Sequence, residues 1–327
     1  MAERTKVLVT GATGFIGSGL VMHLAADSRW RVVASVRSKS LALAEGVDVF
    51  PVGNIGPDTD WSKALSGVEV VVHTAAVAHV RSFKAADQLE RLRRTNVDGA
   101  LCLARQALAA GVRRFVFISS IGVSGTGSKH QPFNELSPPE PHAAYALSKL
   151  DAEEALKGLF ANTTTELVII RPPLVYAAHA PGNFKWLLRI VDWGLPLPFA
   201  RVANSRSIVA LENLIDLIRC CLTHPAAANE LFVVEDGSPV STANIVRYLA
   251  AGMGRRGRLF SFPAAFIALA CRTLGVGGIY TQLFESLVVD GSKARQLLGW
   301  RPVVGTEAGL IQAGAEFKRM RSLKKDR

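Results

Sequence analysis

Short apolar runs alternate with longer amphipathic stretches through the first half of the chain. The apolar runs are rich in Val and Ile, which favours β-strands, whereas the stretches between them have the spacing of helices. We predict strands over Lys6–Thr10, Arg31–Val36, Val47–Val52, Val68–His73, Arg114–Ser119 and Glu166–Arg171, and helices over Val97–Ala110 and Tyr145–Phe160. This alternation predicts an α/β fold with a parallel, doubly wound sheet, whose ligands bind at the carboxyl ends of the strands.

A glycine-rich turn follows the first strand and precedes a helical stretch through Leu24. Gly11 permits a tight turn, Gly14 lets the backbone approach a pyrophosphate, and Gly17 allows the helix to pack on the strand. The N–H groups at the start of the helix favour an anion. Because the glycines stand between a strand and a helix, the turn predicts a dinucleotide site.

The end of the second strand indicates which dinucleotide binds. Ser35 stands where an NAD site usually places an acidic residue, and Arg37 follows two positions later. A guanidinium at that point accepts a ribose 2′-phosphate through a charge-assisted hydrogen bond. We therefore expect NADP(H) in preference to NAD(H), although Arg37 is also compatible with an ordinary surface arginine.

Tyr145 and Lys149 are four residues apart at the start of a predicted helix, so both side chains lie on one face. An adjacent ammonium favours the phenolate, and we expect it to lower the pKa of Tyr145 for proton exchange. Ser120 follows a buried strand, where its hydroxyl is placed to share a substrate oxygen with Tyr145. Solvent-exposed helix residues and a turn-capping serine are the alternatives.

Together, the glycine turn, Ser120 and the Tyr145/Lys149 pair resemble the extended short-chain dehydrogenase/reductases, also called the NAD-dependent epimerase/dehydratase family. The resemblance implies Ser120, Tyr145 and Lys149 as catalytic residues on a Rossmann fold. It implies cofactor contacts from Gly11, Thr13, Gly14, Phe15, Ile16, Gly17, Asn54, Ile55, Thr74, Ala75, Ala76, Asn96, Tyr145, Lys149, Pro172 and Val175. We expect the Rossmann domain over residues 1–175, with a segment near 205–235 returning to it, and a smaller α/β substrate domain over 176–327.

Substrate residues are expected in two places: in the segment after residue 175 and at the carboxyl ends of the predicted strands. Asn183 and Arg206 stand in segments that resemble those gripping the uracil and diphosphate of a UDP-sugar, and Ser120 is expected to contact the sugar as well. His79, just beyond the cofactor edge, is a further candidate for the sugar. A capping asparagine, an exposed arginine and a structural histidine are the alternatives.

Several segments also resemble bacterial UDP-4-keto-6-deoxy-N-acetylhexosamine 4-reductases, which serve surface polysaccharide (O-antigen) synthesis. These segments include Ser119–Gly125, Ile169–Tyr176 and Ser292–Trp300. The resemblance predicts that NADPH reduces the C4 ketone of a UDP-sugar while Tyr145 donates the proton. One alternative is a UDP-hexose 4-epimerase with retained NAD, and a second is a non-catalytic dinucleotide sensor.

Composition narrows the class of protein further. The 327 residues are 49% hydrophobic and 20% charged, which is typical of a globular protein. The net charge of +11 suits ligands that carry phosphates, with no nucleic-acid partner expected. Its four cysteines lack metal-ligand spacing, so no metal is expected. The apolar run Leu259–Cys271 is too short to span a bilayer and predicts a buried or interfacial helix. We expect a cytoplasmic protein, and the resemblance implies a homodimer, the state that is frequent in the resembled family.

Overall fold

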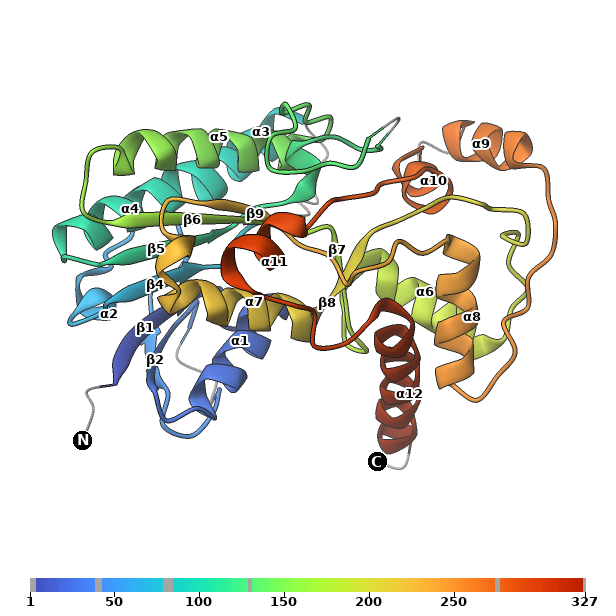
Figure 1. The fold of residues 1–327 in the computed structure, drawn as a ribbon, viewed down its shortest axis with the longest axis horizontal. Coiled ribbons are helices and arrows are strands. Elements are labelled where there is room, and N and C mark those ends of the chain that lie inside the picture. The colour runs from blue at the N-terminus through green and yellow to red at the C-terminus, as the bar shows by residue number, and fades with distance from the viewer. Residues whose placement is uncertain (1–3, 39–42, 79–84, 129–130, 274–276, 326–327) are drawn as a thin grey trace.

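A seven-stranded parallel sheet forms the centre of the larger unit of the protein in this computed structural model (Figure 1). The structure describes residues 4–38, 43–78, 85–128, 131–273 and 277–325. The strand order is β3-β2-β1-β4-β5-β6-β9. The strands are β1 Thr5–Thr10, β2 Trp30–Val36, β3 Asp48–Pro51, β4 Val70–His73, β5 Arg114–Ile118, β6 Glu166–Arg171 and β9 Leu231–Val233. The expected α/β fold with a doubly wound parallel sheet is confirmed.

Helices cover both faces of this sheet because the strands are apolar on both sides. In β1, Val7 and Val9 face a core shared with one group of helices, whereas Leu8 faces the core on the other side. The first group comprises α1 Phe15–Ala25, α7 Leu211–Thr223 and α11 Ser292–Leu298. The second comprises α2 Ser62–Leu65, α4 Gly99–Ala109 and α5 Ala144–Phe160. Near-continuous apolar strands of this kind are expected when both faces of a parallel sheet are buried.

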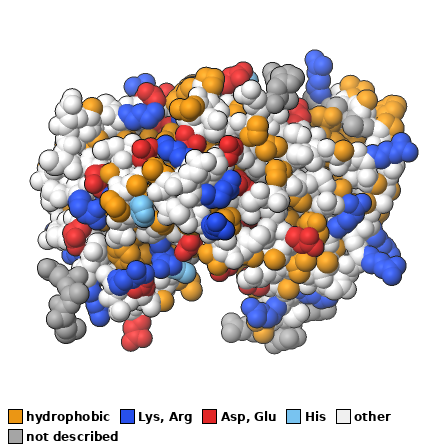
Figure 2. Space-filling view, viewed as in Figure 1, with side chains coloured by type: hydrophobic (Ala, Val, Ile, Leu, Met, Phe, Trp, Pro, Cys, Tyr) orange, Lys and Arg blue, Asp and Glu red, His pale blue; other side chains and the backbone are white. Residues whose placement is uncertain are grey.

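A smaller unit with its own core packs beside the sheet (Figure 1). Its two-stranded parallel sheet consists of β7 Leu174–Tyr176 and β8 Ile208–Ala210. Its helices are α6 Gly182–Trp193, α8 Thr242–Gly252, α9 Ala264–Thr273, α10 Gly277–Phe284 and α12 Thr306–Lys325. Side chains of α6, α8 and α12 form the core of this unit. Lys and Arg side chains are spread over the visible face of both units (Figure 2).

The observed boundaries differ from the predicted ones mainly between β4 and β5. A helix begins there at α3 Ala85–Leu92, continues as the π-helix Arg93–Asp98 and then becomes α4. The sequence-based expectation placed its start at Val97. The earlier part is amphipathic but polar overall, with three arginines and few apolar residues, so the prediction did not extend the helix upstream of Val97.

Candidate functional site

The glycine-rich turn after β1 packs tightly against the end of β4. Gly11 has φ +66°, and Gly14 N donates a hydrogen bond of 2.8 Å to Gly11 O. A Cβ atom on Gly11 would lie 2.8 Å from Ala75 Cα, and one on Gly17 would lie 2.2 Å from Gly11 O. Side chains at these two positions would therefore collide with backbone. The turn folds in this form because the sequence supplies glycine at both points.

A cavity of about 820 Å³ opens at this turn, along the carboxyl ends of the first strands of the sheet. Its volume is within the range of small-molecule sites, roughly 300–1,000 Å³. The structure brings nine expected cofactor contacts to its wall: Gly11, Thr13, Gly14, Arg37, Asn54, Ile55, Thr74, Ala75 and Ala76. Ser35, which the sequence placed at the ribose position, lines the cavity as well, whereas Ser38, Arg91, Arg94 and Thr95 are lining residues that the sequence reasoning missed. Arg91 and Arg94 belong to the helical segment whose start was misplaced.

The wall of this cavity suits an anionic ligand. Three arginines, Arg37, Arg91 and Arg94, line it, and none of the described lining residues is Asp or Glu. The helix α1 begins at the cavity without a side-chain cap on Gly14, so its positive dipole end is available to a phosphate. Ser35 Oγ is buried and lacks a hydrogen-bond partner within the described part of the chain. A ligand hydroxyl or phosphate is the kind of group that would satisfy it.

Lys149 is held inside the protein beneath this edge of the sheet. Its side chain is 1% exposed, and Nζ donates a 2.8 Å hydrogen bond to the carbonyl oxygen of Ile118. The same Nζ lies 4.5 Å from the centre of the Phe117 ring, which adds a cation–π contact. Burial lowers the pKa of Lys149 to about 7, against the opposing effect of the Glu153 carboxylate.

Tyr145 lies on the first turn of α5 and is partly buried. Burial raises the pKa of Tyr145 to about 12 in this structure, whereas we expected the neighbouring ammonium to lower it. The reason is loss of water around the phenol, which disfavours its charged form. Lys149 Nζ meanwhile donates to the Ile118 carbonyl. Tyr145 is therefore protonated at neutral pH in this state of the protein.

A buried ion pair lies one helical turn beyond Lys149. The Glu153 side chain is 0% exposed, and its Oε2 is 2.6 Å from an Arg171 terminal nitrogen at the end of β6. Arg171 Nε also donates to Glu153 Oε1 at 2.9 Å, so the pair is bidentate. The Ser119 hydroxyl donates to the same carboxylate, and Arg171 donates to Ser124 Oγ at 3.3 Å. This network fixes α5 against β5 and β6 and supplies a negative charge near Lys149.

His73 is a buried structural residue next to the site and not a reactive group. Its Nδ1 lies 2.8 Å from Thr10 Oγ1, and its ring stacks on Phe117 with 5.9 Å between centroids. Burial, with a smaller effect from the Lys149 charge, lowers the pKa of His73 to about 3. The imidazole is therefore neutral, which limits the positive charge buried beside Lys149.

Ser120 caps the 3₁₀ turn Ile121–Val123, where its Oγ accepts a 3.1 Å hydrogen bond from Gly122 N. A Cβ atom on Gly122 would lie 3.3 Å from Ser120 Oγ and 3.4 Å from Ala146 Cβ. The hydroxyl therefore lies beside the first turn of α5, which carries Tyr145. The capping alternative is thus present, and the capping oxygen still has its proton to donate, so the expected substrate contact stays a prediction.

Other expected cofactor contacts are not on the wall of the cavity at the glycine turn and instead make hydrogen bonds or packing contacts near it. Asn96 accepts a hydrogen bond from Val77 N at 2.8 Å and donates to Val77 O and to Ser148 Oγ. It therefore links the segment that follows β4 to α5. Pro172 O accepts a 3.0 Å hydrogen bond from Ile121 N, next to Ser120. Packing positions in or against the core are occupied by Phe15, Ile16, Gly17 and Val175.

The expected substrate residues are placed differently from the cofactor residues. Arg206 is 8% exposed, and one terminal nitrogen donates to Glu285 O at 2.7 Å and to Thr281 O at 3.4 Å. Asn183 is exposed and donates to Gln282 Oε1 at 2.7 Å. Both side chains thus bind the end of α10, and neither is among the residues that line the two cavities described here. His79 lies outside the described residues.

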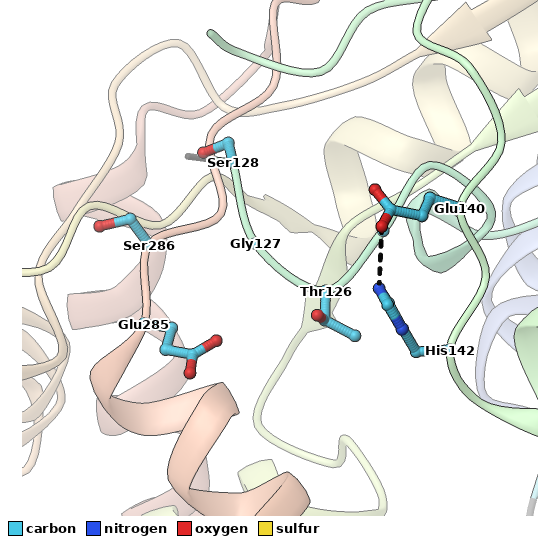
Figure 3. Close-up of a pocket in the computed structure, with 8 residues that line it drawn as sticks. Thr126, Gly127, Ser128, Glu140, His142, Glu285 and Ser286 are labelled. Atoms are coloured by element: carbon cyan, nitrogen blue, oxygen red, sulfur yellow. Dashed lines mark ion pairs between the residues drawn. The ribbon is translucent and has the colours of Figure 1, made fainter. Parts of the chain in front are cut away.

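A second cavity, of about 450 Å³, lies between the two units of the protein (Figure 3). One wall comes from the loop that follows Ser120, and another from the loop that precedes Tyr145. The third comes from the segment after α10. The lining residues are Gly125, Thr126, Gly127, Ser128, Glu140, His142, Glu285 and Ser286. His142 Nε2 and Glu140 Oε1 are 3.7 Å apart on one side, with Glu285 and Ser286 across from them. Hydroxyls and carboxylates of this kind suit the hydroxyl groups of a sugar, whereas the carboxylates would repel a diphosphate.

Comparison with known proteins identifies the family. Residues 7–234 match the NAD dependent epimerase/dehydratase family. The chain belongs to this family. The match covers the seven-stranded sheet except for Thr5 and Lys6 at the start of β1. It also covers both segments that carry Ser120, Tyr145 and Lys149.

The similarity to individual known proteins covers most of the chain. A UDP-glucose 4-epimerase of Vibrio cholerae is 40% identical over 314 residues, 95% of this chain and 95% of the relative. An N-acetyl-α-D-glucosaminyl-diphospho-ditrans,octacis-undecaprenol 4-epimerase of Escherichia coli O157:H7 is 27% identical over 77% of this chain and 73% of the relative. The UDP-glucuronic acid 4-epimerase of Bacillus cereus has the same fold, with a TM-score of 0.78, 23% identity and 97% of each chain covered.

The buried network around Lys149 makes a test of stability. We expect Glu153→Gln to lower the free energy of unfolding by about 3–5 kcal/mol, because it leaves two buried cations without their carboxylate. The adjacent Glu154→Gln removes only an exposed pair with Lys157 and should change it by less than about 0.5 kcal/mol. Urea denaturation followed by circular dichroism measures both. Equal small effects would show that the pair at Glu153 is not a buried support of the fold.

Proposed function

We propose that this protein is a nucleotide-sugar 4-epimerase that oxidises and re-reduces C4 of a UDP-hexose on a retained NAD. The observation that carries the proposal is the 40% identity to a UDP-glucose 4-epimerase over 95% of both chains. The site supports it, since the sugar-compatible cavity borders the loops that carry Ser120 and Tyr145. Among the functions considered from the sequence, the relatives favour the epimerase over the 4-ketoreductase that we expected first.

The dinucleotide would be held by the glycine turn and the cationic cavity. Gly11, Thr13 and Gly14 would approach its pyrophosphate at the start of α1, and Ser35 offers its unpaired hydroxyl to a ribose. Asn54 and Ile55 would border the adenine. A bound nicotinamide would supply the hydride acceptor and donor at C4.

The chain's own residues would manage the proton at the sugar oxygen. Tyr145 removes the proton from the C4 hydroxyl as C4 is oxidised, and returns it when the ketone is reduced. Ser120 donates a hydrogen bond to the same oxygen and thereby stabilises the charge that develops there. In the complex with cofactor, Lys149 would provide positive charge that favours the phenolate, and the Glu153 carboxylate favours the charged form of Lys149.

The sugar would occupy the second cavity. Thr126, Ser128 and Ser286 offer hydroxyls, while Glu140 and Glu285 offer carboxylate acceptors for hydroxyl protons. An epimerase must present either face of C4 to the nicotinamide, so it needs room for the ring to turn. A cavity of about 450 Å³ shared by two units of the protein provides such room.

Product analysis tests the proposal. The purified protein with NAD should interconvert a UDP-hexose and its C4 epimer, observed by NMR, without net change in the reduced cofactor. Tyr145→Phe should slow this roughly 10²- to 10⁴-fold, the typical contribution of a positioned acid or base. Tyr248→Phe, on α8 in the smaller unit, serves as the matched control and should retain activity. Unchanged turnover in Tyr145→Phe would remove the catalytic role of Tyr145. Binding of the dinucleotide without turnover of any UDP-sugar by the wild type would favour the dinucleotide sensor.

A second candidate function is the NADPH-dependent reduction of a UDP-4-keto-6-deoxy-N-acetylhexosamine in surface polysaccharide synthesis. Two observations favour it. Arg37 lines the cavity beside Ser35, with no carboxylate among the described lining residues, and this arrangement suits a 2′-phosphate. Burial also keeps Tyr145 protonated at neutral pH, and a protonated phenol is the form that donates to a ketone oxygen. In this reaction NADPH would be consumed stoichiometrically.

Cofactor preference separates the two candidates. If Arg37 binds a 2′-phosphate, Arg37→Ser should weaken NADPH binding roughly 10- to 100-fold, the value of a hydrogen bond to a charged group, and leave NADH unchanged. Arg31→Ser removes the same charge at the opposite end of β2 and should alter neither. Isothermal titration with both cofactors measures this. NADPH affinity that is unchanged in Arg37→Ser would exclude the 2′-phosphate role and leave the epimerase with NAD.

A further inference from the structure

The smaller unit exposes a group of aromatic side chains at α9. Phe260 and Phe262 precede this helix, and Phe266 and Leu269 lie on it. The exposed fractions are 46% for Phe262, 63% for Phe266 and 60% for Leu269. The rings of Phe260 and Phe262 are 6.4 Å apart, and those of Phe262 and Phe266 are 6.1 Å apart. The three rings are therefore neighbours, and Leu269 follows Phe266 by three residues on the same helix. These four residues are here called the aromatic face, and an exposed apolar surface of this kind indicates an interaction site.

Positive charge surrounds the aromatic face. The sequence contains no Asp or Glu between Asp236 and Glu285, although this interval includes several arginines. Four of them are exposed close to the aromatic face in sequence: Arg255, Arg256, Arg258 and Arg272. Figure 2 shows hydrophobic side chains at the end of the molecule where Figure 1 places α9, with Lys and Arg side chains around them. The surface thus combines phenyl rings with cations and excludes carboxylates from its own segment.

These two features together match one kind of partner. We propose that the aromatic face docks on an anionic phospholipid bilayer, with the phenyl rings in the headgroup region and the arginines on the lipid phosphates. Interfacial binding strengthens with buried apolar area and with attraction of Lys and Arg to anionic lipid. A second copy of this chain, docked through the same face, would place arginine against arginine. Charge complementarity therefore favours the bilayer.

The length of α9 is consistent with binding at the surface of a bilayer. The helix has 10 residues, and its single charged residue is Arg272 at the end. Among the described residues, no helix is long and apolar enough to cross a membrane. α9 also packs on α10, whose last turn binds Arg206 and leads directly to Glu285 at the second cavity. Docking at α9 would thus hold α10, which leads to this cavity, close to the membrane. The inference does not depend on which reaction the site performs.

Vesicle co-sedimentation of the full chain tests the proposal. The protein should bind vesicles of phosphatidylcholine mixed with phosphatidylglycerol, bind phosphatidylcholine alone much more weakly, and dissociate as salt rises. Arg255→Glu/Arg256→Glu should reduce binding by more than roughly 25-fold, since each Arg near an anionic surface contributes about fivefold. Phe262→Ser/Phe266→Ser should reduce it at least roughly tenfold through loss of apolar contact. The two variants alter different side chains. If one of them misfolds, vesicle binding by the other still tests the proposal.

Matched controls separate docking at this face from general attraction of a basic protein. Lys63→Glu/Arg105→Glu changes the net charge equally at exposed sites on the Rossmann unit, and Met22→Ser/Leu136→Ser removes exposed apolar side chains there. Both should keep wild-type binding and all variants should keep the wild-type melting temperature. Equal loss in the controls, or no binding to the anionic vesicles, would overturn the proposal. It would also be overturned by a dimer that Phe262→Ser/Phe266→Ser dissociates while vesicle binding is unaffected.

Discussion

The burial of the Lys149 ammonium is the interaction on which the site depends. An isolated charge inside a protein is strongly unfavourable, and here it is stabilised by the Ile118 carbonyl, the Phe117 ring and the nearby Glu153 carboxylate. Glu153 in turn needs Arg171 at the end of β6. Because these contacts join α5 to β5 and β6, they set where the first turn of α5 lies, and with it the phenol of Tyr145. The same contacts place Ser120 beside that turn.

Around this buried centre, the edge of the sheet divides into two chemically different cavities. The cavity at β1 to β4 has arginines, glycine backbone and a helix N-terminus, which suit the phosphates of a dinucleotide. The cavity between the two units has hydroxyls and carboxylates, which suit a sugar. Tyr145 follows the loop that lines the second cavity, so under the proposed function proton transfer would take place on the sugar side. The separation lets the same scaffold serve epimerisation or reduction, depending on how tightly the cofactor is held.

Local patterns in the sequence predicted the parts of the structure that are local. The glycine turn, most strand positions and the Tyr145/Lys149 spacing follow from short-range steric and periodic rules, and the structure has them. The positions of Arg91 and Arg94 on the cavity wall were missed because they lie on a helical segment that is polar overall and was not predicted to be helical. Arg206 was expected to bind phosphate, but a fold-dependent contact gives its guanidinium two backbone carbonyls. Likewise, the pKa of Tyr145 depends on burial and on where Lys149 points, which spacing alone does not contain.

The ionisation of Tyr145 tests the central claim most directly. Ultraviolet difference titration of the wild type against Tyr145→Phe isolates this one phenol from the other tyrosines. In the free protein the account predicts that Tyr145 stays protonated beyond its ordinary pKa of 10.0, with a pKa of about 12. Saturation with oxidised cofactor should shift this ionisation towards neutral pH, because the cationic nicotinamide and Lys149 both favour the phenolate. A pKa that is identical with and without cofactor would contradict the placement of Tyr145 at the reacting centre.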